Sequence, residues 1–93
     1  MGGTRHLNYH IESTKRFKKE MSKLDKYTQS MIKTWIANNI QDCSDPRAHG
    51  KSLTGNRNGQ WRYRIGDYRV ICEIHDDMLL ILALSVGHRK NVY

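Results

Sequence analysis

Cysteine, acidic residues and long apolar runs are all scarce in this 93-residue chain, and each scarcity excludes a class of protein. The two cysteines are too few for a disulfide framework, and neither they nor the five histidines stand at metal-ligand spacing. We therefore expect no metal, no cofactor and a reducing, cytoplasmic environment. The longest apolar run, 78–84, is too short to cross a membrane. No basic segment followed by an apolar one opens the chain, so nothing predicts secretion.

Positive charge is what the chain has in excess. Sixteen lysines and arginines face nine acidic residues, which gives a net charge of +7. Such an excess predicts binding to a polyanion, most commonly a nucleic acid, although a merely soluble basic surface is the alternative. The length predicts a single domain over residues 1–93, with 1–6 as a loose N-terminus.

The first half of the chain predicts a strand followed by two helices. Residues 7–11 alternate between apolar and polar, as a half-buried strand does. Ser13 or Thr14 is expected to cap the first helix and Asp25 the second. The apolar positions at helical spacing are Phe17, Met21 and Leu24, then Met31, Ile32, Trp35, Ile36 and Ile40.

The second half predicts a loop and three strands. Residues 42–60 are rich in turn-forming residues, and we expect a loop there with one helical turn near Pro46. Period-two segments follow at 61–65, 68–75 and 78–86, joined by two-residue turns at 66–67 and 76–77. The order β-α-α-β-β-β predicts an α+β domain with a helical hairpin on a small antiparallel sheet. The last strand is apolar on both sides and should be central.

The first predicted hairpin places arginines together. If Gly66-Asp67 is the turn, Arg64 lies opposite Arg69, and Arg62 shares their face. Like charges in direct cross-strand pairs are destabilising, so the cluster suggests an anion site. Guanidinium groups suit phosphate because they are planar and permanently charged. Charges that deter sheet aggregation are the plainer explanation.

The end of the chain adds further polar chemistry. His88, Arg89 and Tyr93 follow the last predicted strand and offer an imidazole, a guanidinium and a phenol. A surface role for His88 is the commoner case. Trp35 and Trp61 are expected in the core, and Cys43 and Cys72 as small buried apolar residues.

Several short motifs stand in order along this half of the chain. They are Leu-Thr-Gly at 53–55, Trp-Arg-Tyr-Arg-Ile at 61–65, Gly-Asp-Tyr-Arg-Val at 66–70, and Val-Gly-His-Arg at 86–89 followed by Val-Tyr at 92–93. Together they resemble the RelE/ParE superfamily of bacterial toxins, and the RelE branch more closely, over residues 7–93. The resemblance implies a microbial-ribonuclease-like fold and cleavage of mRNA in the ribosomal A site. It also implies a RelB-like antitoxin, which holds the toxin inactive in a hetero-oligomer, and no membrane partner.

The resemblance also implies site residues. The catalytic set carried over is Arg62, Arg64, Arg69, Arg89 and Tyr93, with His88 as a substitute for proton transfer. Lys51, Arg57 and Lys90 are further candidates for RNA binding. The best-known family member has lysines where this chain has Arg62 and Arg64. Since arginine is a poorer proton donor, the general acid and base stay open here.

Two other functions compete with the ribonuclease. A ParE-like toxin resembles the same fold but poisons DNA gyrase. A non-catalytic RNA-binding module would use the same arginines for affinity alone.

Overall fold

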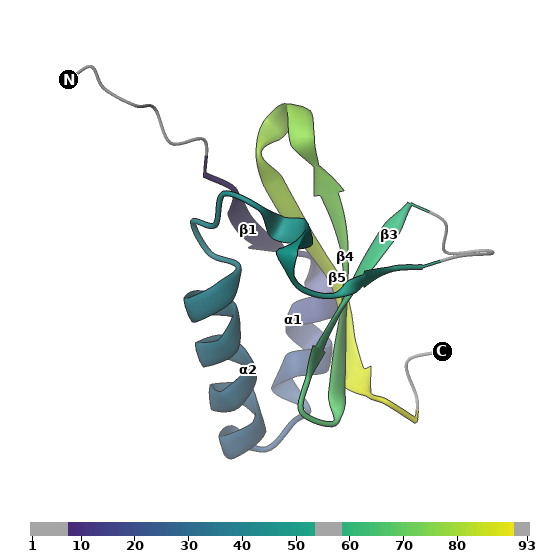
Figure 1. Ribbon diagram of the computed structural model, residues 1–93. Coiled ribbons are helices and arrows are strands. Elements are labelled where there is room, and N and C mark those ends of the chain that lie inside the picture. Colours follow the sequence, from purple (N-terminus) through teal and green to yellow (C-terminus); the bar gives the residue numbers. More distant parts are fainter. Residues whose placement is uncertain (1–7, 54–58, 91–93) are drawn as a thin grey trace.

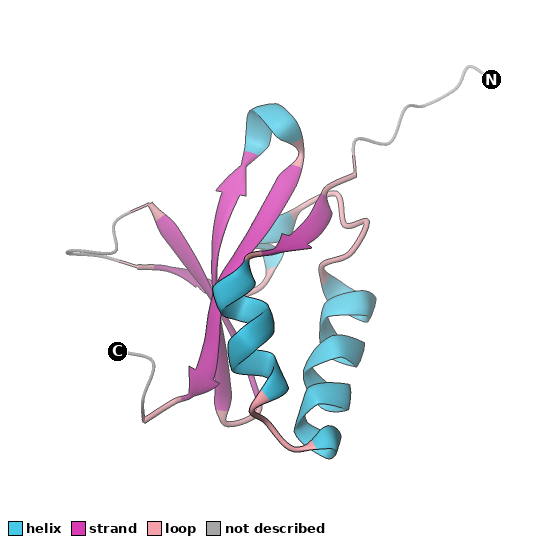
Figure 2. Ribbon diagram, turned by 180° about the vertical axis from the view of Figure 1, so that it is seen from behind, coloured by secondary structure: helices cyan, strands magenta, loops and turns pink. Residues whose placement is uncertain are grey.

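The computed structural model describes residues 8–53 and 59–90. Within them the elements are, in chain order, β1 (His10–Ser13), α1 (Lys15–Ser22), α2 (Lys26–Asn39), a 3₁₀ turn (Pro46–Ala48), β2 (Lys51–Ser52), β3 (Gln60–Ile65), β4 (Tyr68–His75), a second 3₁₀ turn (Asp76–Met78) and β5 (Leu80–His88). The two helices lie side by side on one face of the sheet (Figures 1 and 2). The predicted α+β class and helical hairpin are confirmed.

Both helices begin at the residues that the sequence predicts. The Thr14 hydroxyl accepts a hydrogen bond from the Phe17 amide, and the Asp25 carboxylate accepts one from the Thr28 amide. Each cap satisfies an amide that has no partner inside its own helix. The Asp25 cap also lowers the pKa of that carboxyl, because the hydroxyl and amide of Thr28 both bond the charged form.

The sheet is mixed rather than purely antiparallel. Its strand order is β1-β5-β4-β3-β2, and β1 runs parallel to β5 while the other neighbours are antiparallel. The helical hairpin between β1 and the rest of the chain makes the parallel pairing possible. As predicted, β5 is an inner strand. It begins two residues later than expected, because Asp76–Met78 form a 3₁₀ turn with Leu79 in the left-handed region.

One strand was not predicted. Lys51 and Ser52 form β2 and pair with Arg62 and Trp61 of β3. Two residues are too few to display an alternating pattern, so the sequence signal there is that of a loop. The predicted helical turn near Pro46 is present, and the buried Tyr63 hydroxyl donates to the Pro46 carbonyl.

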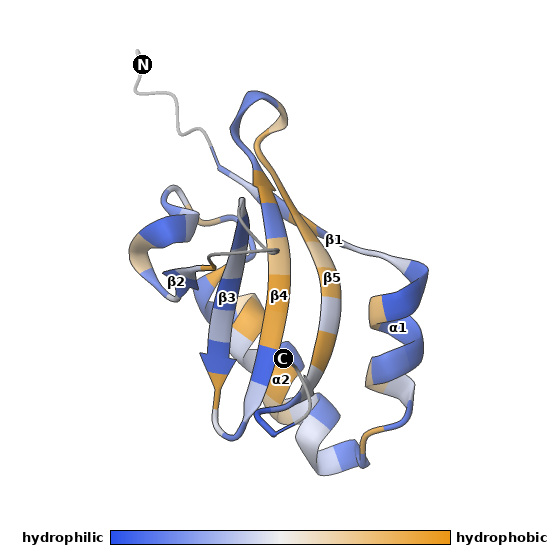
Figure 3. Cartoon of the chain, turned by 90° about the vertical axis from the view of Figure 1, so that its right-hand side faces the viewer, coloured by the Kyte–Doolittle hydropathy of each residue, from blue (hydrophilic) through white to orange (hydrophobic). Residues whose placement is uncertain are grey.

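The main core lies between the helices and one face of the sheet. Tyr63, Ile65, Val70 and Cys72 are almost fully buried there, against the helix residues Phe17, Met21 and Ile32. Burial raises the pKa of the Cys72 thiol to about 12, so this side chain is an inert apolar filler. Figure 3 looks onto the opposite, open face, where β3 is mostly hydrophilic and β4 and β5 mostly hydrophobic.

Helix α1 contacts the part of the β5 edge that extends past the end of β1. Ser13, the last residue of β1, pairs with Ala83, so the rest of β5 has no pairing with β1. From there the Thr14 hydroxyl bonds the Ala83 and Leu84 carbonyls, and the Glu20 carboxylate accepts from the Val86 amide at 3.0 Å. The cap residue Thr14 and the α1 residue Glu20 therefore hold the part of β5 that leads to Arg89.

Neither described helix has the length and apolar character that a bilayer-crossing segment needs.

Candidate functional site

The hairpin of β3 and β4 brings three arginines to the open face of the sheet. Arg64 lies directly opposite Arg69, and Arg62 is two residues before Arg64 on the same strand. The turn is Gly66-Asp67, with Gly66 at φ +60°, as the first central residue of a type II′ hairpin turn requires. The predicted register is therefore confirmed. We call Arg62, Arg64 and Arg69 the arginine face.

An apolar patch lies beside the arginine face. Leu53 and Ile71 are buried there, and Leu84 packs against them. The pairing of β4 with β5 shifts between Ile71 and Cys72, which marks a β-bulge. This patch replaces water next to the guanidinium groups, and charge interactions strengthen where water is displaced.

Arg69 lies beside this patch, two residues before Ile71 on the same face of β4. It pairs with Gly87 of β5, which has no side chain, and its Nε is buried without a hydrogen-bond partner among the described residues. A buried donor without a partner costs free energy. A phosphate oxygen would satisfy it and bring an opposite charge.

Lys51 joins the arginine face through β2. It pairs with Arg62, and directly paired residues point to the same face of a sheet. Its side chain is exposed. Lys51 is one of the RNA-binding candidates expected from the sequence, but its position beside Arg62 depends on β2, which the sequence pattern does not predict.

The end of β5 positions the next two candidates differently. The Arg89 amide donates to the Asp67 carbonyl at 2.8 Å, which ties Arg89 to the turn of the arginine hairpin. His88 pairs with Tyr68, and their rings pack edge to face at 5.4 Å. Since Tyr68 packs toward the core, His88 lies across the sheet from the arginine face. The exposed Lys90 donates its amide to His88 Nδ1 at 3.3 Å.

Two predicted site residues, Arg57 and Tyr93, lie outside the described residues. Within the described ranges, no group of acidic, histidine and cysteine side chains is arranged to hold a metal ion.

Comparison with known proteins decides the family. The sequence profile of the ParE toxin of type II toxin–antitoxin systems (parDE) matches residues 11–93. The chain belongs to this family. A search of curated proteins finds no match to the toxin's sequence.

Solved structures share the toxin's fold. The RelBE2 toxin–antitoxin complex of Mycobacterium tuberculosis is 21% identical, with a TM-score of 0.81 over 96% of this chain and 100% of that chain. The isolated RelE toxin of Escherichia coli is also 21% identical, with a TM-score of 0.68 over 86% and 83%. The RelE–RelB complex of Pyrococcus horikoshii is 20% identical, with a TM-score of 0.66 over 91% and 99%. The chain and its relatives thus share the RelE/ParE fold.

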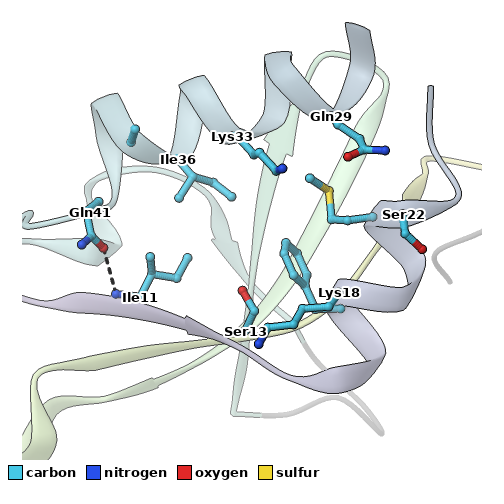
Figure 4. A pocket seen from close by; sticks show the side chains of 11 residues that line it. Ile11, Ser13, Lys18, Ser22, Gln29, Lys33, Ile36 and Gln41 are labelled. Atoms are coloured by element: carbon cyan, nitrogen blue, oxygen red, sulfur yellow. Dashed lines mark hydrogen bonds between the residues drawn. The ribbon is translucent and has the colours of Figure 1, made fainter. Parts of the chain in front are cut away.

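A second feature of the toxin is a groove on the helical side. A cavity of about 550 Å³ lies between α1, α2 and β1. Ile11, Phe17 and Ile36 contribute apolar surface to it, while Lys18 and Lys33 bring positive charge from the two helices (Figure 4). The Ile11 amide at its end donates to the Gln41 side chain at 3.1 Å.

Two hydrogen-bonded acidic groups lie at the end of β4 that is remote from the Arg64–Arg69 pair. Asp76, at the far end of β4, accepts two hydrogen bonds from Arg47 at 2.9 and 3.1 Å and one from Tyr9. The Arg47 guanidinium and the Tyr9 hydroxyl hold the pKa of Asp76 below its usual range. Glu73 bonds His75 at 3.0 Å near the same end of β4, whereas the exposed Asp67 lies in the turn beside the Arg64–Arg69 pair.

Proposed function

We propose that the toxin is a ribosome-dependent, metal-independent endoribonuclease that cleaves mRNA in the ribosomal A site. The observation that carries this proposal is the direct pairing of Arg64 with Arg69, beside Arg62 and Lys51. A fold gains no stability from such a pairing, so a phosphate ligand is its best explanation. The solved relatives named as RelE toxins support the same function.

The chemistry needs no group beyond the RNA and the protein. The 2′-hydroxyl attacks the adjacent phosphorus, the bond to the 5′-oxygen breaks, and the products are a 2′,3′-cyclic phosphate and a free 5′-hydroxyl. Arg69 and Arg89 are proposed to stabilise the charge that develops on the phosphorane oxygens. Arg62 or Arg64 is proposed to lie near the leaving oxygen.

Proton transfer is assigned to Tyr93, with His88 as the alternative. Tyr93 would act as base or orient the 2′-hydroxyl if nearby guanidinium groups lowered its pKa from about 10. His88 carries an imidazole, a common proton-transfer group in catalysis, but it faces away from the arginines and would have to reach around the end of β5. Among the described residues, the arginine face shows no evident acid–base pair, which suits an enzyme that depends on the ribosome to shape its substrate.

A cognate antitoxin is the proposed protein partner, in a hetero-oligomer in the cytoplasm. The RelBE complexes among the solved relatives support this partner. The groove between α1, α2 and β1 suits an amphipathic, acidic segment, because it is apolar inside and carries lysines on both helices.

A gyrase-poisoning activity is the second candidate. The observation in its favour is the matching family profile, which is that of the ParE toxin. The sheet geometry alone fits either target, because both kinds of toxin share this fold.

Induced expression without an antitoxin tests the proposal. We expect growth to stop because translation stops, with mRNA cut within ribosome-bound codons. Arg69→Ala should abolish cleavage. Tyr93→Phe should keep the fold and antitoxin binding while cleavage slows by about 100- to 10,000-fold, the range for a lost acid–base group.

The same experiment has a clear opposing result. Normal protein synthesis at confirmed soluble expression would refute the ribonuclease. Replication arrest that precedes any change in translation would establish the gyrase target. Full cleavage by Tyr93→Phe would move the proton-transfer role to His88, and His88→Ala would test it.

A further inference from the structure

A basic cleft lies at the outer edge of β3, next to the arginine face. Its volume is about 280 Å³, and its lining residues are Trp35, His49, Gly50, Lys51, Arg62 and Arg64. β2 pairs with β3 only as far as Arg62, so residues 63–65 extend past the end of the edge strand. The cleft therefore connects the arginine face with the side of the sheet that carries α2.

The charge of this cleft favours an anion. Lys51, Arg62 and Arg64 bring three cationic side chains, and no lining residue among those the structure describes is acidic. Ligand sites commonly have volumes of about 300–1,000 Å³, so this cleft lies just below the small end of the range. It is large enough for one nucleotide and too small for a folded peptide segment.

One wall of the cleft is aromatic and held in place. The Trp35 ring packs edge to face on His49 with centroids 5.5 Å apart, and it also contacts the buried Tyr63 ring at 5.7 Å. The Trp61 indole donates to the His49 carbonyl at 2.7 Å, which fixes the backbone before β2. A wall fixed before binding lowers the ordering cost of a ligand.

Gly50 brings the backbone close to β3 at this point. Its φ is +82°, and a Cβ there would lie 2.2 Å from the Arg62 carbonyl oxygen and 2.6 Å from the Trp61 indole nitrogen. Only glycine allows this approach. The shape of the cleft thus depends on contacts from three parts of the chain: α2, the turn before β2, and β3.

We propose that this cleft binds one nucleotide of single-stranded RNA adjacent to the nucleotide that is cleaved. Lys51 and Arg64 hold its phosphate, and its base lies against His49 and Trp35. The inference rests on the proposed RNA-cleaving function and makes the cleft a determinant of nucleotide preference beside the cut. An acidic side chain of a protein partner could bind the cations but would make no stacking contact with the aromatic wall. A nucleotide can do both, so it is the favoured occupant of the cleft.

Nuclear magnetic resonance of the full-length toxin tests this inference directly. The probe is a six-nucleotide RNA with 2′-O-methyl riboses, which removes the nucleophile and prevents cleavage. We expect its addition to shift the indole resonance of Trp35, which lines the cleft, more than that of Trp61. His49→Ala and Lys51→Gln should each weaken binding about tenfold or more, as for a lost stacking or phosphate contact.

The His49 and Lys51 variants should keep the fold. The control, Lys15→Gln, removes one positive charge, as Lys51→Gln does. His49 and Lys51 are both exposed, so circular dichroism should be unchanged in either variant. Lys15→Gln removes an exposed lysine from the start of α1 and should bind the hexanucleotide as the wild type does.

The outcomes separate this inference from the proposed function. An unmoved Trp35 resonance, or wild-type affinity in both variants, overturns the inference even if the toxin arrests translation. If the variants lose affinity for the antitoxin and keep it for RNA, the cleft is a protein site and the inference is wrong. If the variants lose RNA affinity while expression leaves translation unaffected, RNA binding by the cleft is supported and the proposed cleavage function is what fails.

Discussion

At the scale of single residues, function and stability oppose each other on the arginine face. Arg64 and Arg69 face each other across two strands, and Arg69 has a buried Nε without a partner among the described residues. Both features cost free energy in the isolated toxin, and a phosphate bound there as proposed would offset that cost. Such a conflict between a local rule and the fold is typical of functional sites.

Arg64→Gln is therefore expected to stabilise the toxin while it disables RNA binding. Removing one of two like charges in a direct cross-strand pair should raise the free energy of unfolding by about 0.2–1 kcal/mol at low salt. The gain should shrink at high salt, because ions screen the exposed pair. Chemical denaturation measures both effects. The same substitution in an Arg69→Ala background is the control, and an equal gain there would exclude the repulsion as its cause.

Asp76 gives the toxin a predictable response to acid. Its carboxylate joins Arg47, before β2, to Tyr9, before β1. Because these hydrogen bonds lower its pKa in the folded state, its contribution to stability is complete above the ordinary pKa of about 4. That contribution is lost as the pH falls through the lower folded-state value.

Asp76→Asn should reduce the free energy of unfolding at neutral pH and flatten its decline below pH 4. Urea unfolding at several pH values measures this, and Asp77→Asn, next in sequence, is the matched control. If both variants show the same pH profile, the bonds of Asp76 do not stabilise the fold.

At the scale of elements, the edges of the sheet decide where the site forms. On one side, β1 and then α1 cover β5, with the Glu20 carboxylate bound to the Val86 amide. On the other side, β2 covers only the first part of β3 and leaves the cleft beside Arg64. The short strand β2 therefore sets both the position of Lys51 and the extent of the cleft.

Gly50→Ala should show how strongly the turn before β2 depends on glycine. Gly59, at φ +92°, is the control, because among the described residues no atom lies within 4 Å of a Cβ built there. Gly59→Ala should cost about 1–2 kcal/mol from its left-handed backbone alone. Gly50→Ala should cost more, because its Cβ collides with the Arg62 carbonyl. Thermal denaturation compares them, and an equal loss would mean that the turn adjusts freely.

At the scale of the whole molecule, the toxin has two distinct faces. The helices bury one face of the sheet and leave the other open (Figures 1 and 3). The arginines of the arginine face lie on the open side. The net charge of +7 favours long-range attraction to a polyanion, and the arginine face is where we propose that RNA makes its local contacts.

The affinity of the toxin for single-stranded RNA should fall steeply with salt. Each neutralised phosphate contributes about −0.7 to the slope of log affinity against log salt concentration. Replacing Arg62 and Arg64 together by alanine should flatten the slope by about 1.4 if each contacts one phosphate. Fluorescence titrations over a range of salt concentrations measure it, with Lys15→Gln plus Lys23→Gln as a charge-matched control. A slope that changes equally in both double variants would indicate general attraction without a defined site.

Much of the site was predictable because it depends on local rules. A two-residue turn with glycine first and strict alternation on both sides determine the pairing of Arg64 with Arg69. The caps at Thr14 and Asp25 likewise need only their neighbours in sequence. The roles carried over from the family resemblance, including those of Arg89 and Tyr93, remain predictions.

The sequence by itself thus determined the helices, the arginine hairpin and the basic character of the toxin. Only the tertiary structure decided which distant segments meet: the parallel pairing of β1 with β5, Lys51 beside Arg62, His88 turned toward Tyr68, and His49 against Trp35. The reason is physical. Contacts between neighbours along the chain follow from backbone geometry, whereas contacts between remote segments depend on how all elements pack together to bury one shared core.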